Sequence, residues 1–190
     1  GLDQRIGDRF LRAGPAYGGS CFPKDTRALI DVANKYKTDL SIVKSVIKSN
    51  NLRKITLTKR IDKILNNRLK NKNITFLGVT FKPNTDDMRE ASSIPMINYL
   101  NKKGSKIRYY DPSGRKKEFD QLKNVKFCSS ISSACIKSDL IIIHTEWNAF
   151  KLLDFKKLVK KKNFKVFDMR NIYSHDKMRY LKIDYTSIGR

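Results

Sequence analysis

Apolar residues recur every three or four positions through the first third of the chain. They do so over residues 26–37 and again, without proline or glycine, over residues 40–65. This spacing predicts two helices, because side chains three and four positions apart lie on the same helix face. Asp25 precedes the first pattern and is a candidate cap for that helix. The second helix is long for a globular protein, so its apolar stripe is a candidate dimer face.

After residue 72 the pattern changes to short apolar runs that alternate with helical spacing. The expected strands cover residues 74–81, 106–112, 139–147, 165–171 and 183–189. The expected helices between them cover residues 93–104, 130–138 and 150–162. Strands that alternate with helices predict an α/β fold with a Rossmann-like, mostly parallel sheet flanked by helices. We therefore divide the chain into residues 1–39, a long central helix over 40–72 and an α/β domain over 73–190.

The chain is strongly basic, with 41 Lys and Arg against 18 Asp and Glu among 190 residues and a formal net charge of +23. Such a charge is one mark of a nucleic-acid-binding domain. The lysines are spread over the whole chain, however, and no zinc finger, RNA-binding aromatic motif or helix-turn-helix accompanies them. We interpret the charge as a compositional bias that includes a moderately basic pocket for an anionic small molecule, and we expect no nucleic-acid partner.

Other features of the composition indicate a cytoplasmic protein without a metal site. No apolar run approaches the roughly 20 residues that cross a bilayer, so we expect no membrane contact. Cys21, Cys128 and Cys135 form no CxxC pair, and His144 and His175 lie far apart, which argues against zinc. Three unpaired cysteines fit a reducing compartment. The opening GLDQRIGDRF has no initiator methionine and no apolar leader, so we expect a fragment of a longer protein.

Charged residues follow several of the expected strands. Lys82 and Arg89 come after the first strand, and Arg170 lies near the end of the run 165–171. Parallel sheets bind ligands beyond the carboxyl ends of their strands, where these cations can grip phosphate oxygens. Surface ion pairs would explain each of them separately. The first turn, LGVTFKPNTDD, lacks GxGxxG and so does not predict a dinucleotide site in this sheet.

The segment AYGGSCFPKD, residues 16–25, places a thiol at an expected bend. Two glycines allow close backbone approach before Cys21, and Pro23 stiffens the chain after it. A thiolate attacks carbonyl carbon well, and Lys24 could stabilise it. Asp25 could position a proton or a water, or cap the following helix. The residues alone leave a catalytic and a structural role for this cysteine equally open, whereas the other two cysteines lie in ordinary strand and helix patterns.

A long run of motifs carries a family resemblance. GLDQRIGDRFLRAGPAYGGSCFPKDTRAL resembles the active-site segment of the UDP-glucose/GDP-mannose dehydrogenase family, and the similarity continues through VIKSNN, FLGVTFKPNTDDMREASS, YDP, TEW and FDMRNIY. It covers practically the whole chain. The segment around the cysteine is more similar to bacterial UDP-glucose enzymes than to GDP-mannose enzymes, which tend to have leucine after the cysteine.

The resemblance implies a three-part enzyme, of which this chain resembles only a portion. Family members have an N-terminal NAD-binding domain, a helical middle domain with a long central helix, and a C-terminal UDP-sugar-binding domain. This chain is similar to the end of the middle domain, the central helix and the C-terminal domain. The main NAD site and an upstream catalytic lysine have no counterpart here, so we expect no activity from this chain alone. The resemblance also implies a homodimer through the central helix.

The same resemblance implies a role for individual residues. In the family, UDP-glucose is oxidised twice by NAD to UDP-glucuronate through a cysteine thiohemiacetal and thioester. The matching catalytic residues are Cys21 as nucleophile, Asp25 for water and proton transfer, and Asn50 on the central helix. Arg89 matches an arginine that meets NAD. The residues that match substrate contacts are Arg5, which reaches the neighbouring subunit's site, and Phe10, Leu11, Tyr17, Gly18, Lys82 and Arg170.

Three other functions remain open at this stage. The base and sugar are chosen by pocket details, so GDP-mannose or a UDP-N-acetylhexosamine is an alternative substrate. A non-catalytic module could use the same pocket to bind a nucleotide sugar without chemistry. A basic nucleic-acid binder is the least favoured reading.

Overall fold

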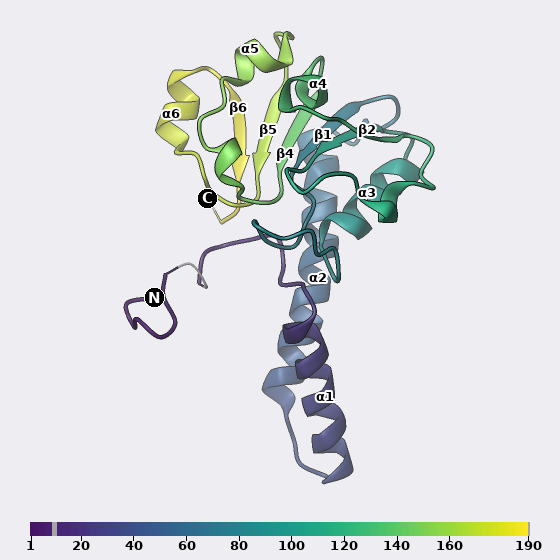
Figure 1. The fold of residues 1–190 in the computed structure, drawn as a ribbon, viewed down its shortest axis with the longest axis vertical. Coiled ribbons are helices and arrows are strands. Elements are labelled where there is room, and N and C mark those ends of the chain that lie inside the picture. Colours follow the sequence, from purple (N-terminus) through teal and green to yellow (C-terminus); the bar gives the residue numbers. More distant parts are fainter. Residues whose placement is uncertain (9–10, 190) are drawn as a thin grey trace.

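Two long helices form a hairpin that projects from an α/β unit (Figure 1). The structure, a computed structural model, describes residues 1–8 and 11–189. The hairpin consists of α1 (Cys21–Lys35) and α2 (Ser41–Ile64), and α2 confirms the helix predicted over residues 40–65. The prediction for α1 was wrong at its start. Ser20 stands at the N-cap, so Asp25 lies inside the helix and does not cap it.

The α/β unit is built on a six-stranded sheet in the order β3-β2-β1-β4-β5-β6, with every neighbouring pair parallel. This order is that of doubly wound sheets, in which ligands bind where the order reverses, here between β1 and β4. The predicted Rossmann-like α/β fold is confirmed. The strands are β1 (Asn73–Leu77), β2 (Lys106–Tyr110), β3 (Val125–Phe127), β4 (Leu140–Ile143), β5 (Lys165–Asp168) and β6 (Asp184–Ser187).

Helices cover both faces of this sheet, and β4 shows how. Leu140 and Ile142 join a buried cluster with α2 and α3, whereas Ile141 and Ile143 join a second cluster with α4, α5 and α6. Side chains alternate across a strand, so the continuous apolar run of β4 supplies both cores. The remaining elements are α3 (Ser93–Lys102), α4 (Ile131–Cys135), α5 (Phe155–Val159), α6 (His175–Tyr180), η1 (Lys117–Phe119) and η2 (Asn148–Phe150).

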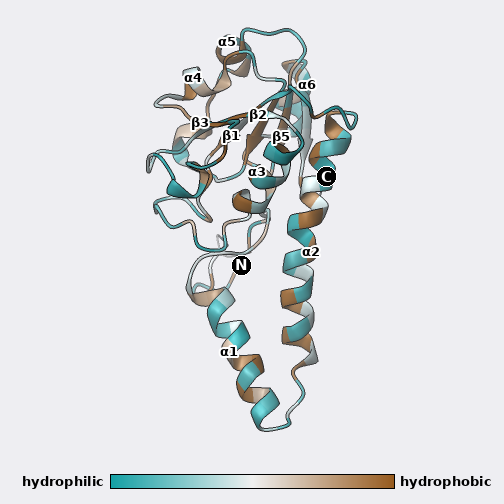
Figure 2. Ribbon diagram, turned by 90° about the vertical axis from the view of Figure 1, so that its right-hand side faces the viewer, coloured by the Kyte–Doolittle hydropathy of each residue, from teal (hydrophilic) through white to brown (hydrophobic). Residues whose placement is uncertain are grey.

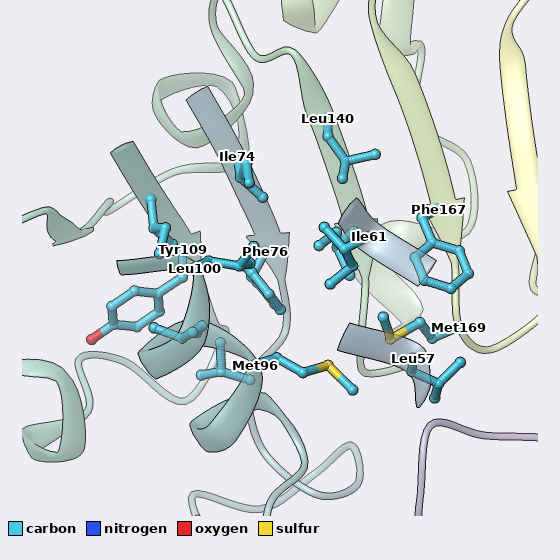
Figure 3. Packing of buried hydrophobic residues seen from close by; sticks show 14 of the residues in the cluster. Leu57, Ile61, Ile74, Phe76, Met96, Leu100, Tyr109, Leu140, Phe167 and Met169 are labelled. Carbon is cyan, nitrogen blue, oxygen red and sulfur yellow. The ribbon is translucent and has the colours of Figure 1, made fainter. Parts of the chain in front are cut away.

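The long helix α2 has two different environments along its length. Its C-terminal half packs on the sheet, where Figure 3 shows Leu57 and Ile61 beside Phe167 and Met169. Its N-terminal half runs beyond the α/β unit next to α1, and hydrophobic and hydrophilic residues follow one another along it (Figure 2). The helix therefore anchors the hairpin to the sheet at one end only.

Three local predictions were wrong. The strand expected over residues 74–81 ends at Leu77, because Gly78 adopts a φ of +76° and its backbone lies so close to Thr145 that a Cβ would be 2.5 Å from that side chain. The helix expected over 150–162 is only α5, which ends at Val159 because Lys160 follows in the left-handed conformation. The short elements β3 and α6 were not predicted.

Candidate active site

The segment that leads to Cys21 lies against the loop after β1. The backbone N–H of Gly19 donates to the carbonyl of Arg89 at 2.7 Å. A Cβ on Gly19 would lie 2.7 Å from the Phe81 ring, and one on Gly18 would lie 2.6 Å from the carbonyl oxygen of Glu90. Neither position has room for a side chain, and Gly19 also has a φ of +83°. The close approach predicted from the two glycines is therefore confirmed.

The helix α2 holds the same segment through its side chains. The amide of Asn50 accepts from the N–H of Tyr17 at 2.9 Å and donates to its carbonyl at 3.1 Å. Three residues further on, Arg53 donates twice to the carbonyl of Gly14, at 3.0 and 2.7 Å. These two positions share a helix face. The structure thus places Asn50 and Tyr17 together beside the cysteine loop, and it adds Arg53, which the sequence analysis missed.

Cys21 is the exposed first residue of α1. Asp25 follows it by four positions, so both lie on one face of the helix. The ammonium of Lys24 pairs with the Asp25 carboxylate at 3.4 Å. Tyr17 packs edge-on against Phe22, with ring centroids 4.7 Å apart. The Cys21 thiol and the Asp25 carboxylate are thus one turn apart at the end of α1 that faces the sheet (Figure 1).

Arg170 lies buried at the carboxyl edge, with 11% of its side chain exposed. Its Nε donates to the carbonyl of His144 and its Nη2 to that of Phe81, both at 2.9 Å. The Glu146 carboxylate lies 3.0 Å from the same Nε. A Cβ on Gly14 would lie 2.7 Å from Nη1. Burial lowers the pKa of Arg170, and Glu146 opposes that shift. This arginine joins the ends of β1, β4 and β5 and reaches the loop that leads to Cys21.

His144 is fully buried beside Arg170, a feature the sequence analysis did not single out. Its Nε2 lies 2.8 Å from Ser92 Oγ and its Nδ1 3.0 Å from Thr145 Oγ1. The Thr145 hydroxyl donates its only proton to the carbonyl of Thr80, so it accepts from His144 Nδ1–H. Burial, reinforced by Arg170, lowers the pKa of His144 to about 3. The imidazole is therefore neutral. The backbone carbonyl of His144 accepts from Arg170, and the ring adds no positive charge beside that arginine.

The two other predicted cations lie at the rim of this edge. Arg89 donates from Nε and Nη2 to the two oxygens of Asp87, at 3.0 and 2.9 Å, which lowers the pKa of that carboxyl. The pKa of Arg89 is raised, first by its hydrogen bond with Asp87. Lys82 is exposed, with its ammonium 5.4 Å from the centroid of the Phe81 ring.

The remaining predicted substrate contacts are not gathered at this site. Arg5 is exposed and pairs with Asp3 at 2.7 Å, and Leu11 is exposed as well. Within residues 1–8 and 11–189, no hydrogen bond or ion pair joins either of them to the cysteine loop. Phe10 lies outside the described residues. The predicted reach of Arg5 into a neighbouring subunit stays a prediction.

Glu90 is a third residue that the sequence analysis missed, after Arg53 and His144. Its Oε1 binds Arg27 of α1 at 2.7 Å and its Oε2 binds Lys54 of α2 at 3.3 Å. These bonds, the Arg27 bond foremost, lower the pKa of Glu90. The only sequence signal is the position of Lys54 on the same helix face as Asn50 and Arg53, which does not reveal a partner in a distant loop.

The turn after β1 does not fit a dinucleotide. In a dinucleotide-binding sheet, the backbone N–H groups of this turn face the pyrophosphate. Here the N–H groups of Val79 and Thr80 donate to the carboxylate of Asp111, at 2.8 and 3.3 Å, and that carboxylate is buried. A negative side chain already occupies the anion position. This agrees with the missing GxGxxG.

The described part of the chain holds neither a metal-binding cluster nor a membrane-spanning helix. Groups of three or more His, Cys, Asp or Glu side chains that could hold a metal ion do not occur there. None of its helices is long and apolar enough to cross a membrane.

Comparison with known proteins gives two family matches. Residues 75–175 match the UDP-binding domain of the UDP-glucose/GDP-mannose dehydrogenase family, and residues 1–52 match the central domain of the same family. The chain is 42% identical over its full length to a UDP-glucose 6-dehydrogenase of Rickettsia typhi and 41% identical to one of Bacillus subtilis. It spans 44% and 43% of the lengths of these relatives.

Solved structures show the same arrangement of elements. A UDP-glucose dehydrogenase from Pyrobaculum islandicum matches with a TM-score of 0.79 and 30% identity, over 98% of this chain and 41% of that protein. An NDP-N-acetyl-D-galactosaminuronic acid dehydrogenase from Methanosarcina mazei matches with a TM-score of 0.78 and 23% identity, over 93% of this chain and 39% of that protein, which bears on the fold alone.

Proposed function

The chain belongs to the UDP-glucose/GDP-mannose dehydrogenase family, and from this premise we propose that it forms the sugar-nucleotide-binding and nucleophile-bearing part of an enzyme that oxidises UDP-glucose to UDP-glucuronate. One observation carries the proposal. The loop that bears Cys21 touches the carboxyl edge of the UDP-binding domain, through Gly19 on Arg89 and Gly14 beside Arg170. A ligand at that edge therefore lies next to the thiol.

We place the diphosphate of the substrate between Lys82 and Arg170. Arginine presents a planar fork that suits phosphate oxygens, and a buried guanidinium acts in a medium that screens its charge poorly. Nη1 of Arg170 faces Gly14, the start of the cysteine loop. Lys82 is exposed at the same edge and supplies a second, mobile charge. In this arrangement the sugar extends from the sheet towards α1.

The proposed chemistry at C6 uses Cys21 as nucleophile. The thiolate adds to the carbonyl carbon of the C6 aldehyde, and the new C–S bond gives a thiohemiacetal. After that carbon is oxidised to the thioester, a water attacks it, the C–S bond breaks, and the thiolate leaves as the carboxylate forms. Asp25, one helical turn away, accepts the proton of the attacking water. Asn50 fixes the loop through Tyr17, which keeps the sulfur in place.

NAD is the oxidant of this proposal and would accept the hydrides that leave C6. The β1 turn of this sheet does not fit it, because Asp111 takes the backbone N–H groups. We assign the main NAD site to the part of the longer relatives that this chain does not span, with Arg89 at the rim facing it. In the longer protein, Cys21→Ser should abolish steady-state UDP-glucuronate formation, because a serine hydroxyl is a far weaker nucleophile than a thiolate.

Calorimetry with UDP-glucose tests the binding part of the proposal. Arg170→Ala should weaken binding at least about tenfold, because loss of a buried charge partner typically costs more than that factor. Arg89→Ala should hardly change it, since that exposed guanidinium is assigned to the cofactor side. Equal losses would mean that the two roles are confused, and no loss for Arg170→Ala would contradict the pocket. GDP-mannose and UDP-N-acetylglucosamine in the same titration decide the sugar nucleotide.

A further inference from the structure

Glu90 joins three parts of the molecule through one side chain and its own backbone. One carboxylate oxygen binds Arg27 of α1 at 2.7 Å, and the other binds Lys54 of α2 at 3.3 Å. Its carbonyl oxygen lies so near Gly18 that a Cβ there would be 2.6 Å away. Its backbone adopts a φ of +55°, which residues other than glycine rarely do. The chain thus holds Glu90 in an unfavourable conformation at the junction of both helices and the cysteine loop.

We propose that Glu90 is a positioning residue that fixes the first turns of α1, and with them Cys21, against the UDP-binding domain. The inference rests on the proposed function only for the meaning of Cys21 as nucleophile. Asn50 and Arg53 hold the backbone of residues 14–17, and among the described residues neither makes a hydrogen bond to α1. Among the described residues, the pair of Arg27 with Glu90 is the one ion pair between α1 and the α/β unit.

The two cations that bind Glu90 differ in exposure. This difference predicts that loss of the carboxylate costs more at Lys54 than at Arg27. Lys54 has 12% of its side chain exposed and Arg27 has 55%. A largely buried ammonium loses more when its carboxylate is removed, because water does not replace the lost partner well. The exposed pair with Arg27 is screened by solvent and is individually weak. Loss of Glu90 therefore releases α1 and also leaves Lys54 without a counter-charge beside the cysteine loop.

Hydrogen–deuterium exchange on the 190-residue chain tests this without any ligand. The amides of Tyr17 and Gly19 are hydrogen-bonded to Asn50 and Arg89, so a peptide over residues 14–21 reports the attachment. Glu90→Gln removes the charge and keeps the size, and it should speed exchange in this peptide about fivefold, since the exposed pair with Arg27 and the more buried pair with Lys54 are both lost. A peptide over 140–147 should be unchanged.

The matched control removes a carboxylate from an ion pair elsewhere. Asp120 binds Arg115 at 2.8 Å, far from α1 in the sequence, and Asp120→Asn should leave exchange in residues 14–21 unaltered. The swapped double variant Arg27→Glu with Glu90→Arg should recover part of the protection that Glu90→Arg alone loses.

Two outcomes would overturn the proposal. Unchanged exchange over residues 14–21 in Glu90→Gln would mean that the other contacts suffice to hold the loop. Equal acceleration in residues 14–21 and 140–147 would make Glu90 a general stabiliser. Because UDP-glucose is absent from this experiment, a failure of UDP-glucose binding would leave its result standing, so the two proposals fail separately.

Discussion

Single residues at the carboxyl edge are kept in place by burial as much as by charge. Arg170 holds a guanidinium beneath the cysteine loop, and His144 directly beside it stays neutral. A second cation there would repel Arg170, and burial removes that cost by keeping the proton off the ring. Of these two adjacent side chains only Arg170 carries a positive charge, and the histidine is a neutral hydrogen-bonded support.

This histidine predicts acid sensitivity of the fold. Its folded pKa of about 3 lies below its ordinary value of 6.5, so the unfolded chain binds a proton first as the pH falls. Unfolding is then favoured, and the free energy of unfolding should drop by about 2 kcal/mol between about pH 7.5 and pH 5. His144→Gln should remove that decrease in urea titrations at the two pH values. An equal slope in the variant would assign the acid sensitivity to another group.

The carboxylates act in a different pH window. The pKa of Glu90 is lowered from 4.5, first by Arg27, and that of Asp87 from 3.8, first by Arg89. Their stabilisation is present above those unfolded values and is lost as the pH falls through the lower folded ones. The stabilisation by these two carboxylates is therefore lost at a lower pH than the one at which His144 begins to destabilise the fold.

Residue-level prediction from sequence succeeded where the signal is local. Two glycines before Cys21 indicated a close backbone approach, which is what Gly18 and Gly19 make. Glu90 gave no comparable signal, because its partners lie 63 and 36 positions away. A carboxylate after a strand looks the same in sequence whether it faces solvent or joins two helices.

At the scale of elements, α2 packs against the sheet only at its C-terminal end. Its C-terminal half supplies Leu57 and Ile61 to the core under the sheet, whereas Ile55 in the same half is largely exposed. Helix periodicity in the sequence predicts the helix but not which of its apolar residues are buried. Only the packing against α3 and the strands decides that.

The difference between these two isoleucines can be measured. Ile61 is 0% exposed and Ile55 is 53% exposed. Ile61→Ala should lower the free energy of unfolding by about 2–5 kcal/mol, because it removes buried methyl groups and leaves a cavity. In the monomer, Ile55→Ala should change it by less than about 0.5 kcal/mol, because that side chain is exposed. Urea titrations at concentrations too low for the proposed dimer compare the same substitution on one helix, and similar losses would mean that another part of the same chain covers Ile55.

Prediction of the strands worked best for the most apolar runs. The run LIII gives β4 because β-branched residues buried on both faces suit the centre of a parallel sheet. The first strand was predicted too long, because the sequence VTF after Gly78 is as apolar as the strand before it. A glycine with positive φ, packed on Thr145, ends it, and Thr145 lies in the loop after β4, over 60 positions later.

At the scale of the whole molecule, the hairpin of α1 and α2 exposes apolar side chains to solvent. This surface supports the homodimer that the family resemblance implies. The exposed large apolar side chains on α1, on its C-cap and on α2 are Phe22, Leu29, Val32, Tyr36, Ile42, Val46, Leu52 and Ile55. We expect a dimer mass by light scattering at micromolar concentration. Ile42→Lys with Ile55→Lys should give the monomer mass, because charges are costly to bury in an interface.

The matched control for this dimer lies on the α/β unit. Leu152 is an exposed apolar residue near η2, and Leu152→Lys should leave the dimer intact. A monomer mass for the unaltered chain would contradict the proposal, and loss of the dimer in both variants would place the contact elsewhere.

We expect this Rossmann-like sheet not to bind NAD. The strand order is that of dinucleotide-binding sheets, yet the buried Asp111 carboxylate accepts from the N–H groups of Val79 and Thr80. A pyrophosphate at that turn would meet a negative charge and find its donors taken, so fold alone is a poor guide to the ligand here. Titration of the 190-residue chain with NAD should therefore give no binding heat, and a mixture with UDP-glucose should form no NADH. UDP-glucose in the same calorimeter is the positive control, and NAD binding with a micromolar Kd would show that another surface of this chain accepts the cofactor.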